Sequence, residues 1–200
     1  MFINGDKMSH YFENDKNLKS NEQVIKVSIL NTDFTFSTDS GVFSKKGLDF
    51  GTRTLLESLS PLKGNILDLG CGYGPIGIIL SKLNEIKVDM IDINERSVEL
   101  AKRNADKNKV NVNIVSSDGF DNIKKEYDYI ISNPPIRIGK EKMYQLLIDA
   151  LKHLKKDGEL WIVINKEQGA KSLINDFEVE YTVEVVNKNK GFYIIKLKNH

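Results

Sequence analysis

The chain has 200 residues, and its 29 lysines and arginines nearly balance 28 aspartates and glutamates. This length suits one domain with a full core, and the charge balance excludes a global basic field for nucleic acid, although local lysine patches remain open. A single cysteine excludes a disulfide framework, and the three histidines lack ligand spacing for a metal. Neither a signal peptide nor a membrane span of roughly 20 apolar residues is visible, so we expect the protein to be located in the cytoplasm.

The first 60 residues differ from the rest of the chain. We predict a small β-hairpin from the segments VIKVSIL (24–30) and DFTFST (33–38), and then a helix over FGTRTLLESLSPL (50–62). We expect residues 1–60 to form an extension that packs over one face of a single structural unit, residues 61–200.

From Asn65 onward, short apolar runs alternate with longer amphipathic segments. The predicted strands are NILDLG, KVDMIDI, VNIVSS, YDYIIS and ELWIVI, and the predicted helices are PIGIILSKL, NERSVELAKRNADKNK and KEKMYQLLIDALKHLKK. Asn94 is placed to cap the second of these helices, and Gly158 to end the turn after the third. Alternating strands and helices indicate parallel βαβ units, so we predict an α/β fold with a doubly wound, mostly parallel, Rossmann-like sheet of seven strands.

The last part of the sequence has a helical segment over 168–177 and two more strands, EVEYTVEVV and GFYIIKLK. The connection between these strands, NKNKG, is too short for a helical crossover, so we predict an antiparallel C-terminal hairpin. Ligands of doubly wound sheets bind at the carboxyl ends of the strands, and the motifs found there therefore indicate the function.

A glycine-rich segment, LDLGCGYGPIG (67–77), follows the first strand of the repeating pattern. Its closely spaced glycines let the backbone turn tightly and approach a ligand, and Pro75 is suited to open a helix. The segment contains G-x-G-x-x-G from Gly72 to Gly77, so a nicotinamide-dependent oxidoreductase is a competing interpretation. Asp92 ends the next strand, where a carboxylate can bind both ribose hydroxyls of either kind of cofactor.

The motif DLGCGYG resembles the acid-x-Gly-x-Gly-x-Gly motif of class I S-adenosylmethionine-dependent methyltransferases. The resemblance implies S-adenosylmethionine as cofactor, with the loop from Asp68 to Gly74 at its methionine end, Asp92 at its ribose and Asp118 at the adenine amino group. For Asp118, an ordinary Asp-Gly turn is the alternative, and we interpret Cys71 as a small loop residue rather than a catalytic thiol. The residues expected to bind the cofactor are Asp68, Gly70, Cys71, Gly72, Gly74, Asp92, Ile93, Asp118, Gly119 and Asn133.

The segment ISNPPIRIGK (131–140) follows the predicted strand YDYIIS. Two consecutive prolines cannot continue a strand ladder, so the Asn133 side-chain oxygen and the Pro134 carbonyl form a rigid pair of acceptors. Such a pair can bind both hydrogens of a planar amine at about 2.9 Å, which favours a more pyramidal nitrogen with its lone pair directed at the methyl group. NPPI resembles the (D/N)-P-P-x motif of methyltransferases acting on planar amines, which implies catalytic roles for Asn133, Pro134, Pro135 and Ile136.

Ile136 departs from this motif, because many relatives have an aromatic residue there that stacks on the target base. We therefore expect stacking from another ring, with Phe43, Phe50 and Tyr144 as candidates. Since a base extruded from a duplex needs such a surface, we favour a target that is already unpaired or readily exposed.

Two further stretches, DSGVFSKKGLDFGTRTLLE (39–57) and NPPIRIGKE (133–141), extend the resemblance to nearly the whole chain. With the glycine loop they closely resemble the catalytic domain of the 16S ribosomal RNA guanine 2-amino methyltransferases, the methyltransferase small domain group. This implies ribosomal RNA or the small ribosomal subunit as partner, and contact of segment 39–51 with cofactor or substrate. Better-known bacterial members carry a second, degenerate copy of the domain, which we do not expect here; a homodimer would be another way to grip the substrate.

A basic group, Arg137, Lys140 and Lys142, lies beside the NPPI motif and is a candidate for binding phosphates, with a solvated surface as the alternative. The residues expected to bind the substrate are Phe43, Phe50, Arg137 and Lys140. Three other functions stay open: methyl transfer to an adenine amine or a glutamine side chain, the oxidoreductase, and a binding module without turnover.

Overall fold

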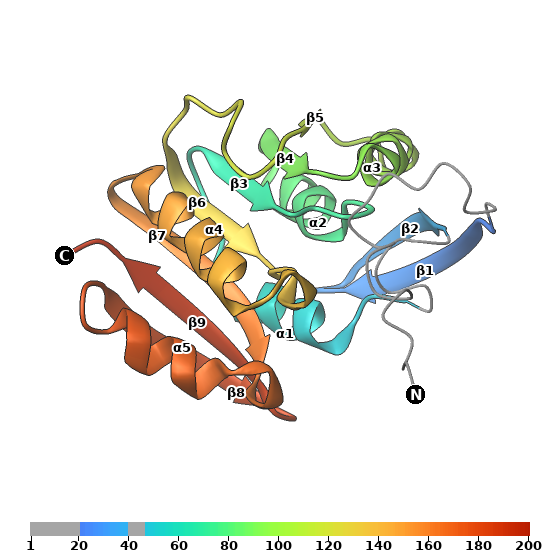
Figure 1. Cartoon of the computed structure of the whole chain (residues 1–200). Helices are drawn as coiled ribbons and strands as arrows, with labels where there is room; N and C mark the ends of the chain where they lie inside the picture. The colour runs from blue at the N-terminus through green and yellow to red at the C-terminus, as the bar shows by residue number, and fades with distance from the viewer. Residues whose placement is uncertain (1–20, 40–46) are drawn as a thin grey trace, which may run out of the picture.

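A computed structural model describes residues 21–39 and 47–200 of the chain. These residues form a two-stranded hairpin, a seven-stranded sheet and five α-helices (Figure 1). The strands are β1 Gln23–Ile29, β2 Thr32–Thr38, β3 Ile66–Leu69, β4 Val88–Asp92, β5 Val112–Ser116, β6 Tyr127–Ser132, β7 Leu154–Asn165, β8 Thr182–Asn189 and β9 Phe192–Lys198. The helices are α1 Phe50–Ser58, α2 Pro75–Asn84, α3 Glu95–Asn108, α4 Lys140–Lys152 and α5 Ala170–Phe177, with short 3-10 turns η2 Ile136–Ile138 and η3 Lys166–Gln168.

The large sheet has the order β5-β4-β3-β6-β7-β9-β8. Strands β3 to β7 pair in parallel, whereas β9 is antiparallel to both β7 and β8. The mostly parallel sheet and its C-terminal antiparallel hairpin confirm the predicted fold class. A dinucleotide-binding sheet keeps its sixth strand beside the fifth, but here β9 lies between β7 and β8, so the topology departs from that of the competing oxidoreductase.

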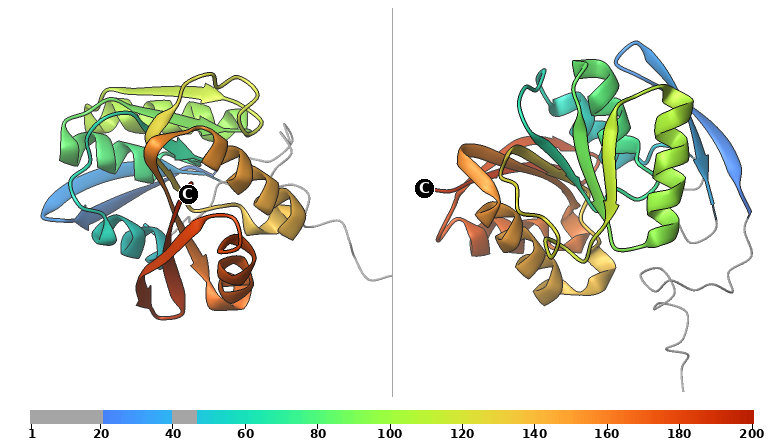
Figure 2. Two further views of the ribbon diagram at one scale, coloured as in Figure 1. Left: turned by 90° about the vertical axis from the view of Figure 1, so that its left-hand side faces the viewer. Right: turned by 90° about the horizontal axis from the view of Figure 1, so that it is seen from above.

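Helices cover both faces of the sheet (Figure 2). Apolar residues of α1, α2 and α3 pack in one buried cluster, with Leu55, Ile79 and Leu100 among them. Residues of α4 and α5, such as Leu147 and Leu173, form a second cluster on the other face. Because the central strands are buried on both sides, their sequences are almost continuously apolar, which is why the repeating pattern was visible in the sequence.

Among the described residues of the N-terminal region, the hairpin β1–β2 packs mainly against α3, and α1 packs on β7 and β9. The hairpin therefore packs on the helices that cover one face of the sheet, and its apolar residues join the buried cluster of that face. A pair of asparagines on α3 binds the free edge of β2 as a neighbouring strand would. Asn104 Oδ1 accepts from Ser37 N at 2.7 Å while its Nδ2 donates to Ser37 O at 2.9 Å, and Asn108 makes the same two bonds to Thr35 at 3.0 and 2.8 Å.

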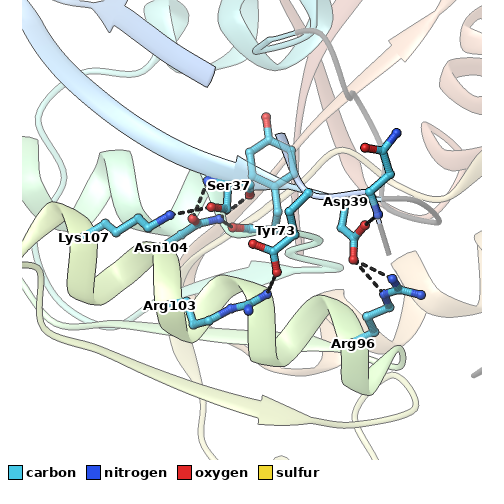
Figure 3. A network of polar contacts seen from close by, with 9 residues as sticks. Ser37, Asp39, Tyr73, Arg96, Arg103, Asn104 and Lys107 are labelled. Carbon is cyan, nitrogen blue, oxygen red and sulfur yellow. Dashed lines mark hydrogen bonds and ion pairs between the residues drawn. The ribbon is translucent and has the colours of Figure 1, made fainter. Parts of the chain in front are cut away.

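Ion pairs and a further hydrogen bond of Asn104 extend the contact between the hairpin and α3 (Figure 3). Asn104 Nδ2 also donates to Tyr73 O, in the glycine-rich loop, at 2.9 Å. Arg96 Nη2 lies 2.5 Å from Asp39 Oδ2, at the end of β2. The hairpin is thus connected to the start of α3 and to the loop before α2.

Several element boundaries differ from the sequence-based prediction, and α1, for example, ends at Ser58 rather than at Leu62. The fourth helix ends at Lys152, and Gly158 lies inside β7, where a Cβ would meet Tyr127 O at 2.8 Å. The register of β6 and β7 shifts at this point, so the glycine allows close approach of two backbones instead of ending a turn. Strand β8 begins at Thr182 and continues through Asn189, which shortens the predicted NKNKG turn to Lys190 and Gly191.

Within the described residues, each helix is too short or too polar to cross a membrane.

Candidate active site

The carboxyl ends of β3 and β6 bring the two sequence motifs together. The strands are neighbours, with Leu69 paired to Ser132, and Ser132 Oγ donates to Leu69 O at 2.8 Å. The strand order reverses between these two strands, which is the position where doubly wound folds bind ligands. The glycine-rich loop after β3 and the NPPI segment after β6 therefore begin side by side.

The glycine-rich loop has an open backbone. Gly70 and Gly72 have φ values of +73° and +56°, and, apart from the adjacent residues, no atom of the described part of the chain lies within 4 Å of a Cβ built on either. The loop is held by Gly70 N and Cys71 N, which both donate to Ile91 O at 2.9 Å. A ligand can therefore reach the backbone at these two glycines without meeting a side chain.

Asp68 lies beneath this loop with 0% of its surface exposed. Its Oδ2 accepts a hydrogen bond from Gly77 N at 2.8 Å, near the start of α2, whereas Oδ1 is buried without a partner in the described structure. Burial raises the pKa of this carboxyl to about 7, the Gly77 bond opposes the shift, and Asp92 adds to it. A buried carboxylate oxygen that lacks a partner fits a cationic group bound against the loop.

The raised pKa of Asp68 predicts a pH-dependent stability of the cofactor-free protein. The unfolded chain loses this proton near pH 4 and the folded chain near pH 7, so stability falls as pH rises through that window and is level above it. The full loss is on the order of 4 kcal/mol. Urea unfolding of wild type and Asp68→Asn between pH 5 and 8 checks this: the difference in unfolding free energy should change with pH in favour of the variant. Parallel curves would contradict it.

The end of β4 supplies a second carboxylate at the same edge. Asp92 is half-buried, and its two oxygens accept from Gly72 N and Asn94 N, each at 2.8 Å. Burial raises the pKa of Asp92, which these backbone bonds oppose. Ile93, next in the chain, is 41% exposed although it is a large apolar residue. Asp118 and Gly119 follow the neighbouring strand β5, and the Asp118 side chain is exposed.

The NPPI segment leaves β6 with two oxygen acceptors available. Asn133 Nδ2 donates to Thr52 Oγ1 at 3.0 Å, which orients the amide, and Thr52 on α1 is 2% exposed. In the described structure, Asn133 Oδ1 and the Pro134 carbonyl accept no hydrogen bond. Pro135 O accepts from Ile138 N at 3.2 Å and so belongs to the following turn, η2. Sequence reasoning missed Thr52, because its 81-residue separation from Asn133 leaves no local signal.

Ile136 and the aromatic residues expected to stack on a base lie in different surroundings. Ile136 is half-buried against the α4–α5 cluster. The ring of Phe50 lies 5.9 Å from that of Phe192, and Lys190 Nζ lies 4.8 Å from its centroid. Tyr144 donates its hydroxyl to Asp176 on α5, so it serves the contact between two helices. Phe43 lies outside the described residues.

The basic residues beside NPPI are only partly available for phosphate. Arg137 is exposed on η2. Lys140 Nζ forms an ion pair with Asp176 Oδ2 at 2.9 Å and bonds to Ser172 Oγ at 3.0 Å. These partners compete with any phosphate for this ammonium group.

The Cys71 thiol is buried, and burial, with Asp92 and Asp68 nearby, raises its pKa well above the usual value. A protonated thiol is a poor nucleophile, which agrees with a packing role. No set of three or more His, Cys, Asp or Glu side chains is arranged around a metal position in residues 21–39 and 47–200.

The family model of the methyltransferase small domain matches residues 33–196. The chain belongs to this family. The match confirms the resemblance inferred from the two motifs and replaces the oxidoreductase interpretation with a methyltransferase. The open loop at Gly70 and Gly72, the unpartnered Asp68 oxygen and the Asp92 carboxylate fit S-adenosylmethionine, the cofactor expected of this class.

Named relatives agree with this family. The chain is 48% identical to the uncharacterized protein YbxB of Bacillus subtilis (strain 168), over 94% of this chain and 98% of that one. It is 34% identical to ribosomal RNA small subunit methyltransferase C of Haemophilus influenzae (strain 86-028NP), over 84% of this chain but 52% of that protein. The chain thus spans about half the length of the methyltransferase C relatives.

A solved structure shares the fold. The 16S rRNA N2 G1207 methyltransferase of T. thermophilus, in complex with AdoMet and guanosine, superposes with a TM-score of 0.79 and 22% identity, and the match covers 92% of this chain and 52% of that one. At this identity the likeness supports the architecture described above.

Proposed function

We propose that this protein transfers a methyl group from S-adenosylmethionine to an exocyclic nucleobase amine, the 2-amino group of a guanine in small-subunit ribosomal RNA. The observation that carries the proposal is the pair of free acceptors, Asn133 Oδ1 and Pro134 O, at the end of β6 beside the glycine-rich loop of β3. The names of the methyltransferase C relatives, and the guanosine bound in the T. thermophilus structure, support the choice of amine.

We assign the parts of the cofactor to residues by the order in which the strands end at the carboxyl edge of the sheet. We assign the methionine end to Asp68 and the loop from Gly70 to Gly74, with Cys71 contributing backbone only. The ribose is assigned to Asp92, and the adenine to Ile93, Asp118 and Gly119, because the ends of β4 and β5 are adjacent. When bound, S-adenosylmethionine supplies a methyl group on a positively charged sulfur, so the leaving group needs no acid.

The difficulty of the reaction lies in the acceptor, whose lone pair is delocalised into the base. Asn133 Oδ1 and Pro134 O would each accept a hydrogen bond from one N–H of the amine. These two bonds hold the nitrogen in place and favour its pyramidal form. Pro135 fixes the direction of the chain, and Ile136 packs under the acceptor loop. Arg137 is the basic residue of this loop that we assign to a flanking phosphate.

Transfer of labelled methyl groups to small ribosomal subunits, naked 16S rRNA, DNA and protein tests the proposal. Label in the guanine 2-amino group of RNA is the expected result. Label in adenine or in a glutamine side chain would assign the same site to another acceptor, and no transfer to RNA would reject the proposal. We expect an enzyme that methylates ribosomal RNA to act in the cytoplasm. The homodimer is a separate prediction, which sedimentation analysis would test.

Thr52 offers a sharper test of the geometry. Thr52→Val removes the hydroxyl that holds the Asn133 amide while keeping the shape of the side chain. Because one hydrogen bond is worth about 1 kcal/mol, we expect kcat to fall about fivefold with the KM for the cofactor unchanged. Thr52→Ser, which restores the hydroxyl, should recover most of the rate. Equal loss in both variants would point to packing rather than orientation.

A further inference from the structure

The tip of the β8–β9 hairpin lies at the carboxyl edge of the sheet. Phe192, the first residue of β9, pairs with Asn165, the last residue of β7. The turn at Lys190 and Gly191 is fixed to η3, because Lys166 N donates to Gly191 O at 2.7 Å. Figure 1 shows the β7 end and the hairpin beside the start of α1. The tip therefore shares an edge with the acceptor loop after the parallel strand β6.

Aromatic contacts connect the tip to the acceptor site. Lys190 Nζ lies over the ring of Phe50, the first residue of α1. Two residues further along this helix is Thr52, whose hydroxyl accepts the hydrogen bond from Asn133. The Phe50 ring also contacts Phe192. On the other side of the hairpin, Lys188 Nζ lies 4.8 Å from the ring centroid of Tyr193. These contacts restrict the stems of two lysines, and one of them, Lys190, packs on α1, the helix that also holds Asn133 through Thr52.

The charge at the tip is not neutralised within the described structure. Lys166, Lys188 and Lys190 are exposed, and none has a carboxylate oxygen within 4 Å there. Glu167 is exposed beside Lys166 but forms no ion pair with it. By contrast, lysines further along the same hairpin are paired, Lys196 with Glu184 and Lys198 with Glu159. A chain with a net charge of only +1 thus leaves three uncompensated lysines around the hairpin tip, at the carboxyl edge of the sheet.

We propose that Lys166, Lys188 and Lys190 bind the phosphates of unpaired RNA on either side of the target nucleotide. Lysine ammonium groups bind phosphate as point charges, and such contacts position a strand without reading its sequence. The cluster is better placed for this task than Lys140, whose ammonium group is bound to Asp176. The inference rests on the proposed function for the identity of the partner, but its binding test does not depend on methyl transfer.

The test replaces the three lysines together by glutamine. A matched control replaces Lys63, Lys87 and Lys156, three exposed lysines at the opposite, amino edge of the sheet, and so removes the same charge. The probe is transcribed, unmodified 16S rRNA, and fluorescence anisotropy gives its Kd at several salt concentrations. We expect the tip variant to bind at least about tenfold more weakly, with a salt slope shallower by about 2, since each phosphate contact of a single strand contributes about 0.7. The control should stay within about twofold of wild type.

Two results would overturn the inference. One is a tip variant with the Kd and salt slope of the wild type; the other is an equal loss in tip and control variants, which would reveal only an effect of overall charge. Cofactor affinity, measured by calorimetry, should be unchanged in the tip variant and shows that it is folded. Failure of the proposed function would appear separately, as a wild-type protein that binds RNA through the tip but transfers no methyl group to it.

Discussion

Replacing Asn133 with alanine should lower kcat by about tenfold or more while leaving the affinity for S-adenosylmethionine within a few fold of wild type. Among residues 21–39 and 47–200 the Asn133 side chain makes one hydrogen bond, to Thr52, and its oxygen accepts none, so the substitution removes an acceptor without unpairing a buried group at the cofactor loop. Single-turnover methyl transfer and calorimetry with the cofactor measure the two effects. Asn113→Ala is a suitable control, because this exposed asparagine of β5 also makes one side-chain bond, to Asp89.

An equal loss of cofactor affinity and turnover in Asn133→Ala would give a different assignment. It would place Asn133 in the cofactor pocket rather than at the acceptor. Asn133→Asp separates the possibilities further, because a carboxylate keeps an oxygen acceptor but cannot donate to Thr52, and it should retain more turnover than the alanine variant.

Asp92→Ala should weaken S-adenosylmethionine binding by at least about 100-fold. Hydrogen bonds to a charged group contribute about 1.5 to 3 kcal/mol each, and we assign two ribose hydroxyls to this carboxylate. The variant also frees Gly72 N and Asn94 N, which Asp92 now holds, so the loop would lose its fixed shape. Calorimetric titration of the cofactor gives the change in Kd directly.

The control for Asp92 is on the same strand. Asp89→Asn changes a carboxylate at the amino end of β4, which binds Lys125 and Asn113, and it should leave the cofactor Kd within about twofold. If Asp92→Ala bound the cofactor as tightly as this control, the ribose would have to be held elsewhere.

The sheet and its loops were predictable because they are local features. Buried parallel strands give apolar runs, the αL glycines before α2 give the glycine-rich motif, and Asn94 caps α3 as predicted, through bonds from Arg96 N and Ser97 N. These signals lie within a few residues of the elements that they define. The family resemblance added the cofactor, which the glycine pattern alone left open.

The remaining contacts were not predictable because they join distant segments. The sequence of α3 is mostly polar, so the contacts of Asn104 and Asn108 with β2 could not be predicted from it. Their spacing of four residues indicates only that both side chains lie on the same face of the helix. Lys140 was a candidate for binding phosphate, with a solvated surface as the alternative, and nothing in the sequence indicated that Asp176 on α5 forms an ion pair with it. The position of Lys190 beside Phe50 depends on how β9 enters the sheet, which no local pattern specifies.

The asparagine contacts between α3 and β2 have a mechanical consequence. Phe34 and Phe36 of the hairpin belong to the same apolar cluster as Leu55 of α1 and Met90 of β4. Detaching the hairpin would uncover this cluster and remove the β2 partners of both α3 asparagines. One of these asparagines, Asn104, also holds Tyr73 in the glycine-rich loop. The hairpin and the cofactor loop are therefore thermodynamically coupled. A ligand that rigidifies the loop also raises the free energy needed to detach the N-terminal hairpin.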